Sequence, residues 1–87
     1  MYHLLLQEVE FVNRSLRALR NDTEAGKVAP GKARRVFAKN YARLDVVLRR
    51  GRAVANALDD CEATSNHAWQ FWYAERNAIS AAMWFLH

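Results

Sequence analysis

Apolar residues recur along the first part of the chain at the spacing of one helix face. Successive positions are three and four residues apart: Tyr2, Leu5, Val9, Val12, Leu16 and Leu19. This period is typical of a helix seam that packs against a core. It predicts a helix over residues 2–22. The following stretch AGKVAPGKA contains two of the three glycines and the only proline, and it predicts a break in the helix.

A second seam with the same period runs through the middle of the chain: Phe37, Tyr41, Leu44, Leu48, Gly51, Ala55 and Leu58. Gly51, within RRGRA, raises the alternative of a helix-turn-helix with the glycine in the turn. A turn would reset the helical phase, whereas the phase continues through Gly51, so the pattern favours one long helix over residues 33–60. A glycine inside a helix costs about 1 kcal/mol relative to alanine, which suggests either a close helix crossing or a slight bend at this position.

The stretch DDCEATSN ends the second helix, and Thr64 or Ser65 is the expected N-cap of a third helix over residues 65–86. At 100° per residue this helix has two apolar faces. The broader face comprises Trp69, Trp72, Tyr73, Ile79, Met83 and Leu86, and the second comprises Phe71, Ala78, Ala82 and Phe85. We expect Trp69 and Trp72 to lie in the core. We predict a twofold homodimer that buries Phe71, Trp84 and Phe85.

Together these patterns predict an all-α fold with a single domain over residues 1–87. The expected architecture is a small three-helix bundle with one long central basic helix and an aromatic C-terminal helix. Composition agrees, because 52% hydrophobic and 25% charged residues are typical of a globular domain. A chain of this length buries only about 60–65% of its unfolded surface, so core residues are scarce.

Charge is strongly segregated along the chain. Residues 25–58 carry nine basic residues and one acid, a net charge of +8, whereas the whole chain has +4. Five of these cations follow one side of the second predicted helix: Lys32, Arg35, Lys39, Arg43 and Arg50. This basic stripe is a candidate partner-binding surface. It suits an acidic protein or a phosphate backbone, and a merely solvated face is an equally open interpretation.

Candidate chemistry is sparse. Cys61 and His67 are six residues apart, which places them on different sides of a continuous helix, and no motif supplies an acid to orient the histidine. His3, His67 and His87 form no spaced metal pair. No glycine-rich phosphate loop is present either. We therefore expect no enzymatic activity, no metal and no cofactor.

One cysteine allows no internal disulfide, which indicates a reducing, cytoplasmic location. Glu75 and Arg76 interrupt the apolar C-terminal stretch and argue against a membrane span. The sequence therefore predicts a protein-binding module, such as a small inhibitor or adaptor that occupies a partner's surface. The alternative is a nucleic-acid-binding protein that uses the basic stripe. Small, basic helical chains of this kind are common among the accessory proteins of phages and plasmids. This association is based on the size of the chain and not on particular residues.

Overall fold

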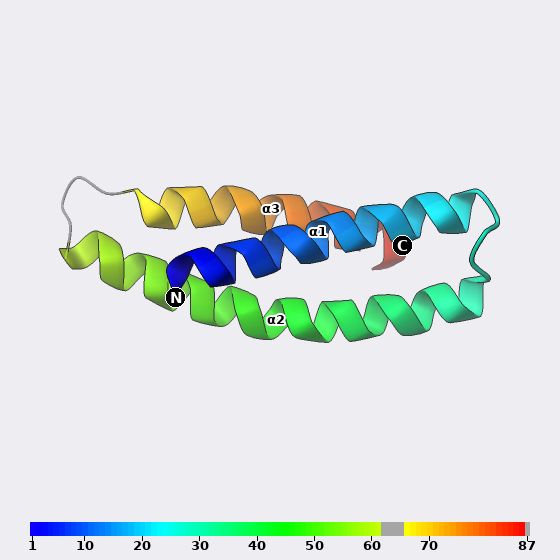
Figure 1. Cartoon of the computed structure of the whole chain (residues 1–87), viewed down its shortest axis with the longest axis horizontal. Coiled ribbons are helices and arrows are strands. Elements are labelled where there is room, and N and C mark those ends of the chain that lie inside the picture. The colour runs from blue at the N-terminus through cyan, green and yellow to red at the C-terminus, as the bar shows by residue number, and fades with distance from the viewer. Residues whose placement is uncertain (62–65, 87) are drawn as a thin grey trace.

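The computed structural model describes residues 1–61 and 66–86, and these form three α-helices with no strand (Figure 1). Helix α1 spans Tyr2–Glu24, α2 spans Pro30–Cys61, and α3 spans His67–Leu86. Each helix packs against both of the others. The predicted three-helix bundle is therefore confirmed.

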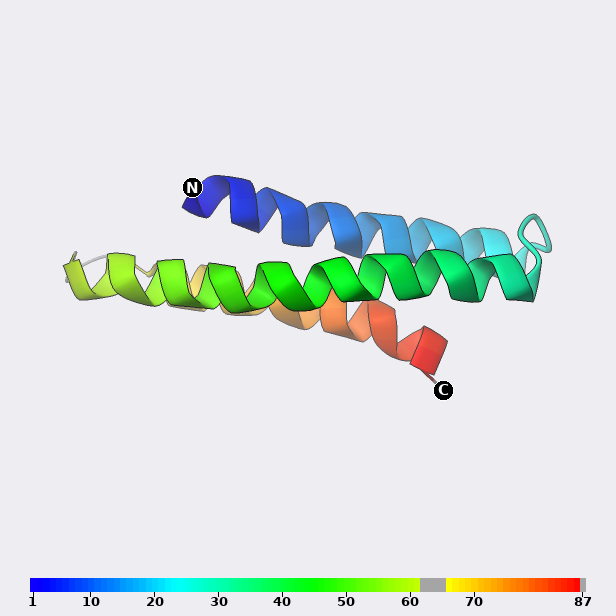
Figure 2. The same cartoon turned by 90° about the horizontal axis from the view of Figure 1, so that it is seen from below.

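The bundle is elongated because α2 is much longer than its neighbours. Its 32 residues correspond to about 48 Å at 1.5 Å per residue, which matches the longest dimension of 49 × 21 × 17 Å. Helix α2 runs antiparallel to both α1 and α3, which are parallel to each other (Figures 1 and 2). At its C-terminal end α2 extends beyond the starts of both α1 and α3, and at its N-terminal end it extends beyond the end of α3 (Figure 1).

The end of α1 lies two residues after the predicted end, and the start of α2 lies three residues before the predicted start. Helix α1 continues to Glu24, and its end is closed by hydrogen bonds from the amides of Ala25, Gly26 and Lys27 to carbonyl groups of the last turn. Gly26 has φ of 76°, a left-handed conformation that glycine adopts without strain. Helix α2 begins at Pro30 and not at residue 33, because proline fits the first turn, where its missing N–H needs no partner.

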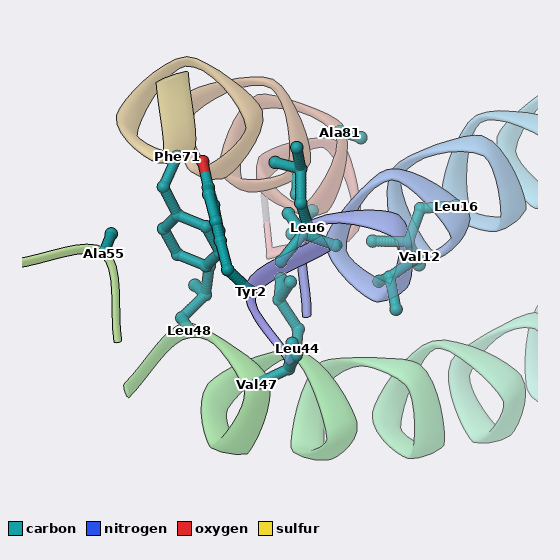
Figure 3. Close-up of a cluster of buried hydrophobic side chains, with 13 residues drawn as sticks. Tyr2, Leu6, Val12, Leu16, Leu44, Val47, Leu48, Ala55, Phe71 and Ala81 are labelled. Carbon is teal, nitrogen blue, oxygen red and sulfur yellow. The ribbon is translucent and has the colours of Figure 1, made fainter. Parts of the chain in front are cut away.

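The predicted seams of α1 and α2 form most of the core (Figure 3). On α1, Leu6 is more buried than the predicted Leu5, which packs at the edge of the core. On α2, Leu44, Leu48, Gly51 and Ala55 are buried, whereas Tyr41 is exposed. The continuous helical phase through Gly51 is confirmed, so the glycine marks no turn.

Helix α3 presents to the core the face that we expected to be the outer one. Phe71 is 1% exposed, and the inner face also contains the buried residues Glu75, Ala78, Ala81 and Ala82. Small residues let the α3 backbone approach its neighbours closely, and an 87-residue bundle has no room for indole rings there. The expectation that Trp69 and Trp72 are core residues is therefore wrong.

The same inversion corrects the residues predicted for self-association. Phe71 is enclosed within the chain and cannot contact a second copy. Phe85 is half-buried and stacks on Phe37 of α2, with ring centroids 4.7 Å apart. Trp84 is also half-buried, and the Arg20 guanidinium of α1 lies 5.4 Å from the centre of its ring. Phe71 is a core residue, and the other two lie where α3 meets its neighbours.

Candidate protein-interaction surfaces

An apolar groove lies between the N-terminal half of α1 and the middle of α2. Its volume is about 490 Å³. Met1, Leu4 and Val46 are 76%, 70% and 57% exposed, and Leu5 and Val47 lie deeper between the helices. An apolar floor of this kind, enclosed between two helices, is the type of surface on which a partner helix docks. We call this surface the α1/α2 groove.

The rim of the α1/α2 groove is charged. Glu8, Arg43 and Arg50 line it. Arg43 forms an ion pair with Glu8 through its Nε atom, and its guanidinium lies 5.6 Å from the centre of the Phe11 ring. Arg50 takes part in none of the ion pairs among the described residues. The rim therefore offers one neutralised pair and one cation that remains available to a carboxylate.

The basic stripe continues from this rim toward the N-terminus of α2. All five of its side chains are exposed, and two of them, Arg43 and Arg50, line the groove. Lys32, Arg35 and Lys39 form no ion pair within the part of the chain that the structure describes. The sequence did not indicate that an apolar groove borders the stripe, because that groove requires α1 to lie beside α2.

A second exposed apolar surface covers the outer face of α3. It comprises six side chains, each between 40% and 56% exposed: Trp69, Trp72, Tyr73, Ile79, Met83 and Leu86. The indoles of Trp69 and Trp72 stack at 5.1 Å and 3°, and the Tyr73 ring meets both of them edge-on. Arg76, with its guanidinium 5.4 Å from the centre of the Trp72 ring, is the one charged residue among them. We call these seven residues the α3 outer face.

Polar residues concentrate where α3 begins, and they hold the three helices together. The Asp59 carboxylate accepts hydrogen bonds from the amides of His67 and Ala68 at 2.9 Å and 2.8 Å. The Tyr2 hydroxyl lies 2.8 Å from Gln70 Oε1 and 3.1 Å from the His67 carbonyl oxygen, within donating distance of both. Burial raises the pKa of Tyr2, and the negative charges of Asp59 and Glu10 raise it further. These bonds cap α3 and attach α1 to it.

Asp59 was not predicted to provide this cap. The predicted N-cap residues, Thr64 and Ser65, lie outside the described residues. One feature of the sequence could have indicated this cap: Asp59 is an acid in the last turn of the second helix, and it is close in sequence to the first amides of the third. Asp59 Oδ1 also lies 3.1 Å from His67 Nδ1, so an acid does orient this histidine. Among the described residues, no three His, Cys, Asp or Glu side chains lie together as metal ligands.

An ion pair with one buried partner fastens α2 to α3. Glu75 has a side chain only 11% exposed, and both of its oxygens contact the guanidinium of Arg52, which is half-exposed. Phe71, Ala55 and Ala68 surround this pair in a small hollow between the two helices. Arg52 thus belongs to the fold and not to the basic stripe.

No protein-family model, curated protein or solved structure matches this chain. Within the described ranges, none of the three helices is both long and apolar enough to cross a membrane.

Proposed function

We propose that this protein is a non-enzymatic protein-binding module, an inhibitor or adaptor, which docks an acidic amphipathic helix of its partner along α2. The supporting observation is that the exposed floor of the α1/α2 groove lies directly beside the basic stripe. The floor provides apolar contact area, and the stripe provides electrostatic complementarity, which steers association and selects the partner.

The length and charge of the basic stripe support an acidic partner helix. Lys32 and Arg50 are eighteen positions apart, so the stripe extends about 27 Å along α2. A docked helix of about five turns would place apolar side chains over Leu4 and Val46 and carboxylates toward α2. Carboxylates on the opposite side would meet Glu8, although that residue is already paired with Arg43. The partner is therefore expected to be acidic on one flank only.

Affinity capture from the source cell tests this proposal when it is combined with groove and stripe variants. Val46→Glu places a carboxylate on the groove floor, and Arg50→Glu reverses the available rim cation. Both side chains are exposed, so neither change opens the core. We expect each variant to lose at least about tenfold in affinity for the captured protein, which corresponds to about 1.4 kcal/mol.

Matched controls carry the same charge changes elsewhere. Asn21→Glu on α1 and Arg34→Glu on α2 alter exposed residues that lie off the basic stripe and line none of the grooves named above, and capture should be unchanged. If all four variants capture the same protein equally well, the groove is not the binding surface.

The nucleic-acid alternative has its own outcome in the same experiment. A stripe that contacts phosphates would bind random oligonucleotides at physiological salt. The affinity would fall steeply as salt is added, and a plot of log affinity against log salt concentration would have a slope of about one per phosphate contact. Arg50→Glu would weaken that binding and lower the slope by about one contact, whereas Leu4→Ala, which removes apolar area from the groove without adding charge, would leave it intact. Such a pattern would replace the protein-binding proposal.

A further inference from the structure

We infer that the α3 outer face is the interface of a twofold homodimer, in which two copies of α3 pack antiparallel to each other. This dimer is independent of the partner site proposed above, because the α1/α2 groove lies across the bundle from the α3 outer face. Three observations support a second copy as the occupant: the area of the face, the order of its side chains and the composition of α3.

The exposed apolar area is close to what a stable dimer requires. Large aromatic and aliphatic side chains present roughly 200 Å² each, so six of them at about half exposure leave about 600 Å² of apolar surface. This value lies at the upper limit of the largest patch on an ordinary monomer, about 300–600 Å². A standard interface buries about 800 Å² on each partner, which the residues bordering the face can complete.

The order of side chains along the α3 outer face makes it complementary to itself. Its N-terminal half holds the aromatic rings, Trp69, Trp72 and Tyr73, and its C-terminal half holds Ile79, Met83 and Leu86. A twofold axis at the level between Asn77 and Ala78 reverses this order in the second copy. Each ring-bearing segment then meets an aliphatic one.

The same axis fixes the register of the contacts. Trp69 lies opposite Leu86 of the second copy, and Trp72 lies opposite Met83 of the second copy. A thioether against an indole is a favourable contact, because sulfur is polarisable and packs at aromatic rings. Bulky rings thus meet flexible or branched side chains rather than each other, which allows the two helices to pack closely.

Arg76, the one charged residue of the face, is compatible with this arrangement. The axis places it opposite Ile79 of the second copy and not opposite its own equivalent. Its guanidinium already lies over the Trp72 ring, and a stacked guanidinium is weakly hydrated and tolerates an interface better than an ammonium group. Because the Arg76 guanidinium is stacked on this ring, it needs no carboxylate from the second copy. A second copy can therefore cover the α3 outer face without an acidic residue opposite Arg76.

The composition of α3 supports association. Helix α3 is the most apolar of the three helices, with only Glu75 and Arg76 charged. In the dimer, α3 becomes a central helix with apolar contacts on both faces. The two α1/α2 grooves remain open on opposite sides, which makes the dimer bivalent.

Analytical ultracentrifugation over a dilution series tests the dimer, with helicity monitored by circular dichroism. We expect the wild-type protein to be dimeric at micromolar concentration. Trp72→Glu and Met83→Glu should each weaken the dimer at least tenfold while helicity is retained, because both side chains are exposed in the single chain. Ala53→Glu, the same charge change on exposed α2, should leave the dimer intact. A wild-type monomer at high micromolar concentration, or variants that dimerise as tightly as wild type, would overturn the inference.

Cysteine pairing tests the register. In a Cys61→Ser background, Trp72→Cys protein is mixed with Met83→Cys protein and oxidised. The antiparallel register predicts the mixed dimer as the dominant product, whereas a parallel pair would give Trp72→Cys homodimers and would overturn it. A wild-type monomer that binds phosphatidylglycerol vesicles with a blue shift of tryptophan emission would assign the face to a membrane surface instead.

Discussion

Phe71 of α3 lies directly over Gly51 of α2. A Cβ atom added at Gly51 would overlap the Phe71 ring, and the ring itself is 1% exposed. The glycine is needed here because the two helices cross with the ring between them, and its φ angle is that of an ordinary helix. This contact explains why a glycine stands at this position of a continuous helix, although glycine lowers the stability of a helix.

Gly51→Ala should therefore destabilise the protein. The added methyl group must displace the enclosed Phe71 ring, and overpacking of this kind costs about 1–3 kcal/mol, more than the helix propensity that alanine restores. Urea unfolding measures the loss. Gly31→Ala is the control, since a Cβ there meets only the Arg35 side chain at 3.9 Å, and it should not destabilise the protein. Equal effects of the two substitutions would show that the Phe71 contact is unimportant.

The Arg52–Glu75 pair should contribute more to stability than a surface pair. Arg52→Ala leaves the enclosed Glu75 carboxylate without its cation, and we expect a loss of about 1–3 kcal/mol; the half-exposed arginine keeps this below the cost for a fully buried pair. Arg49→Ala breaks the exposed pair with Asp45 and should change stability by no more than about 0.5 kcal/mol. Chemical denaturation of both variants gives the comparison, and a smaller loss for Arg52→Ala would contradict it.

Removing the cap on α3 should loosen the start of that helix. Asp59→Ala deprives the amides of His67 and Ala68 of their acceptor and should cost about 1–2 kcal/mol. Hydrogen exchange at these two amides should accelerate. Asp60→Ala removes an exposed neighbouring acid and is expected to leave both quantities unchanged. Protection of the two amides that survives Asp59→Ala would mean that another group provides the cap.

Stability should fall in alkaline solution because of Tyr2. The folded chain holds the phenol proton more tightly than the unfolded chain, since burial raises the pKa of Tyr2 above its ordinary value of 10.0. Below pH 10 both states keep the proton and the stabilisation is complete. As the pH rises above 10, the unfolded chain releases its proton first, so the free energy of unfolding decreases.

Tyr2→Phe tests this dependence through urea unfolding at neutral pH and above pH 10. At neutral pH the variant should lose about 1 kcal/mol, because it lacks the hydroxyl that meets Gln70 and the His67 carbonyl group. Its stability should then fall less than that of wild type as the pH rises. Tyr73→Phe changes an exposed ring and should follow the wild-type curve. Parallel curves for wild type and Tyr2→Phe would contradict the role of this phenol.

Periodicity within the chain was sufficient to predict the number of helices, the core seams of α1 and α2 and the continuity through Gly51. These features are local, because the spacing of apolar residues and the breaks at glycine and proline act within a few turns. The basic stripe was likewise predictable, since it depends on positions around a single helix.

The tertiary structure alone decided which face of α3 is inside. Both faces are apolar, so periodicity could not choose between them. The choice depends on how closely α3 approaches α2, and the alanines of the inner face and the glycine beneath Phe71 allow that close approach. The pairings of Asp59 with the start of α3, Arg52 with Glu75 and Arg43 with Glu8 also join different helices. Such contacts depend on the relative placement of whole helices, which the spacing of residues along one helix does not encode.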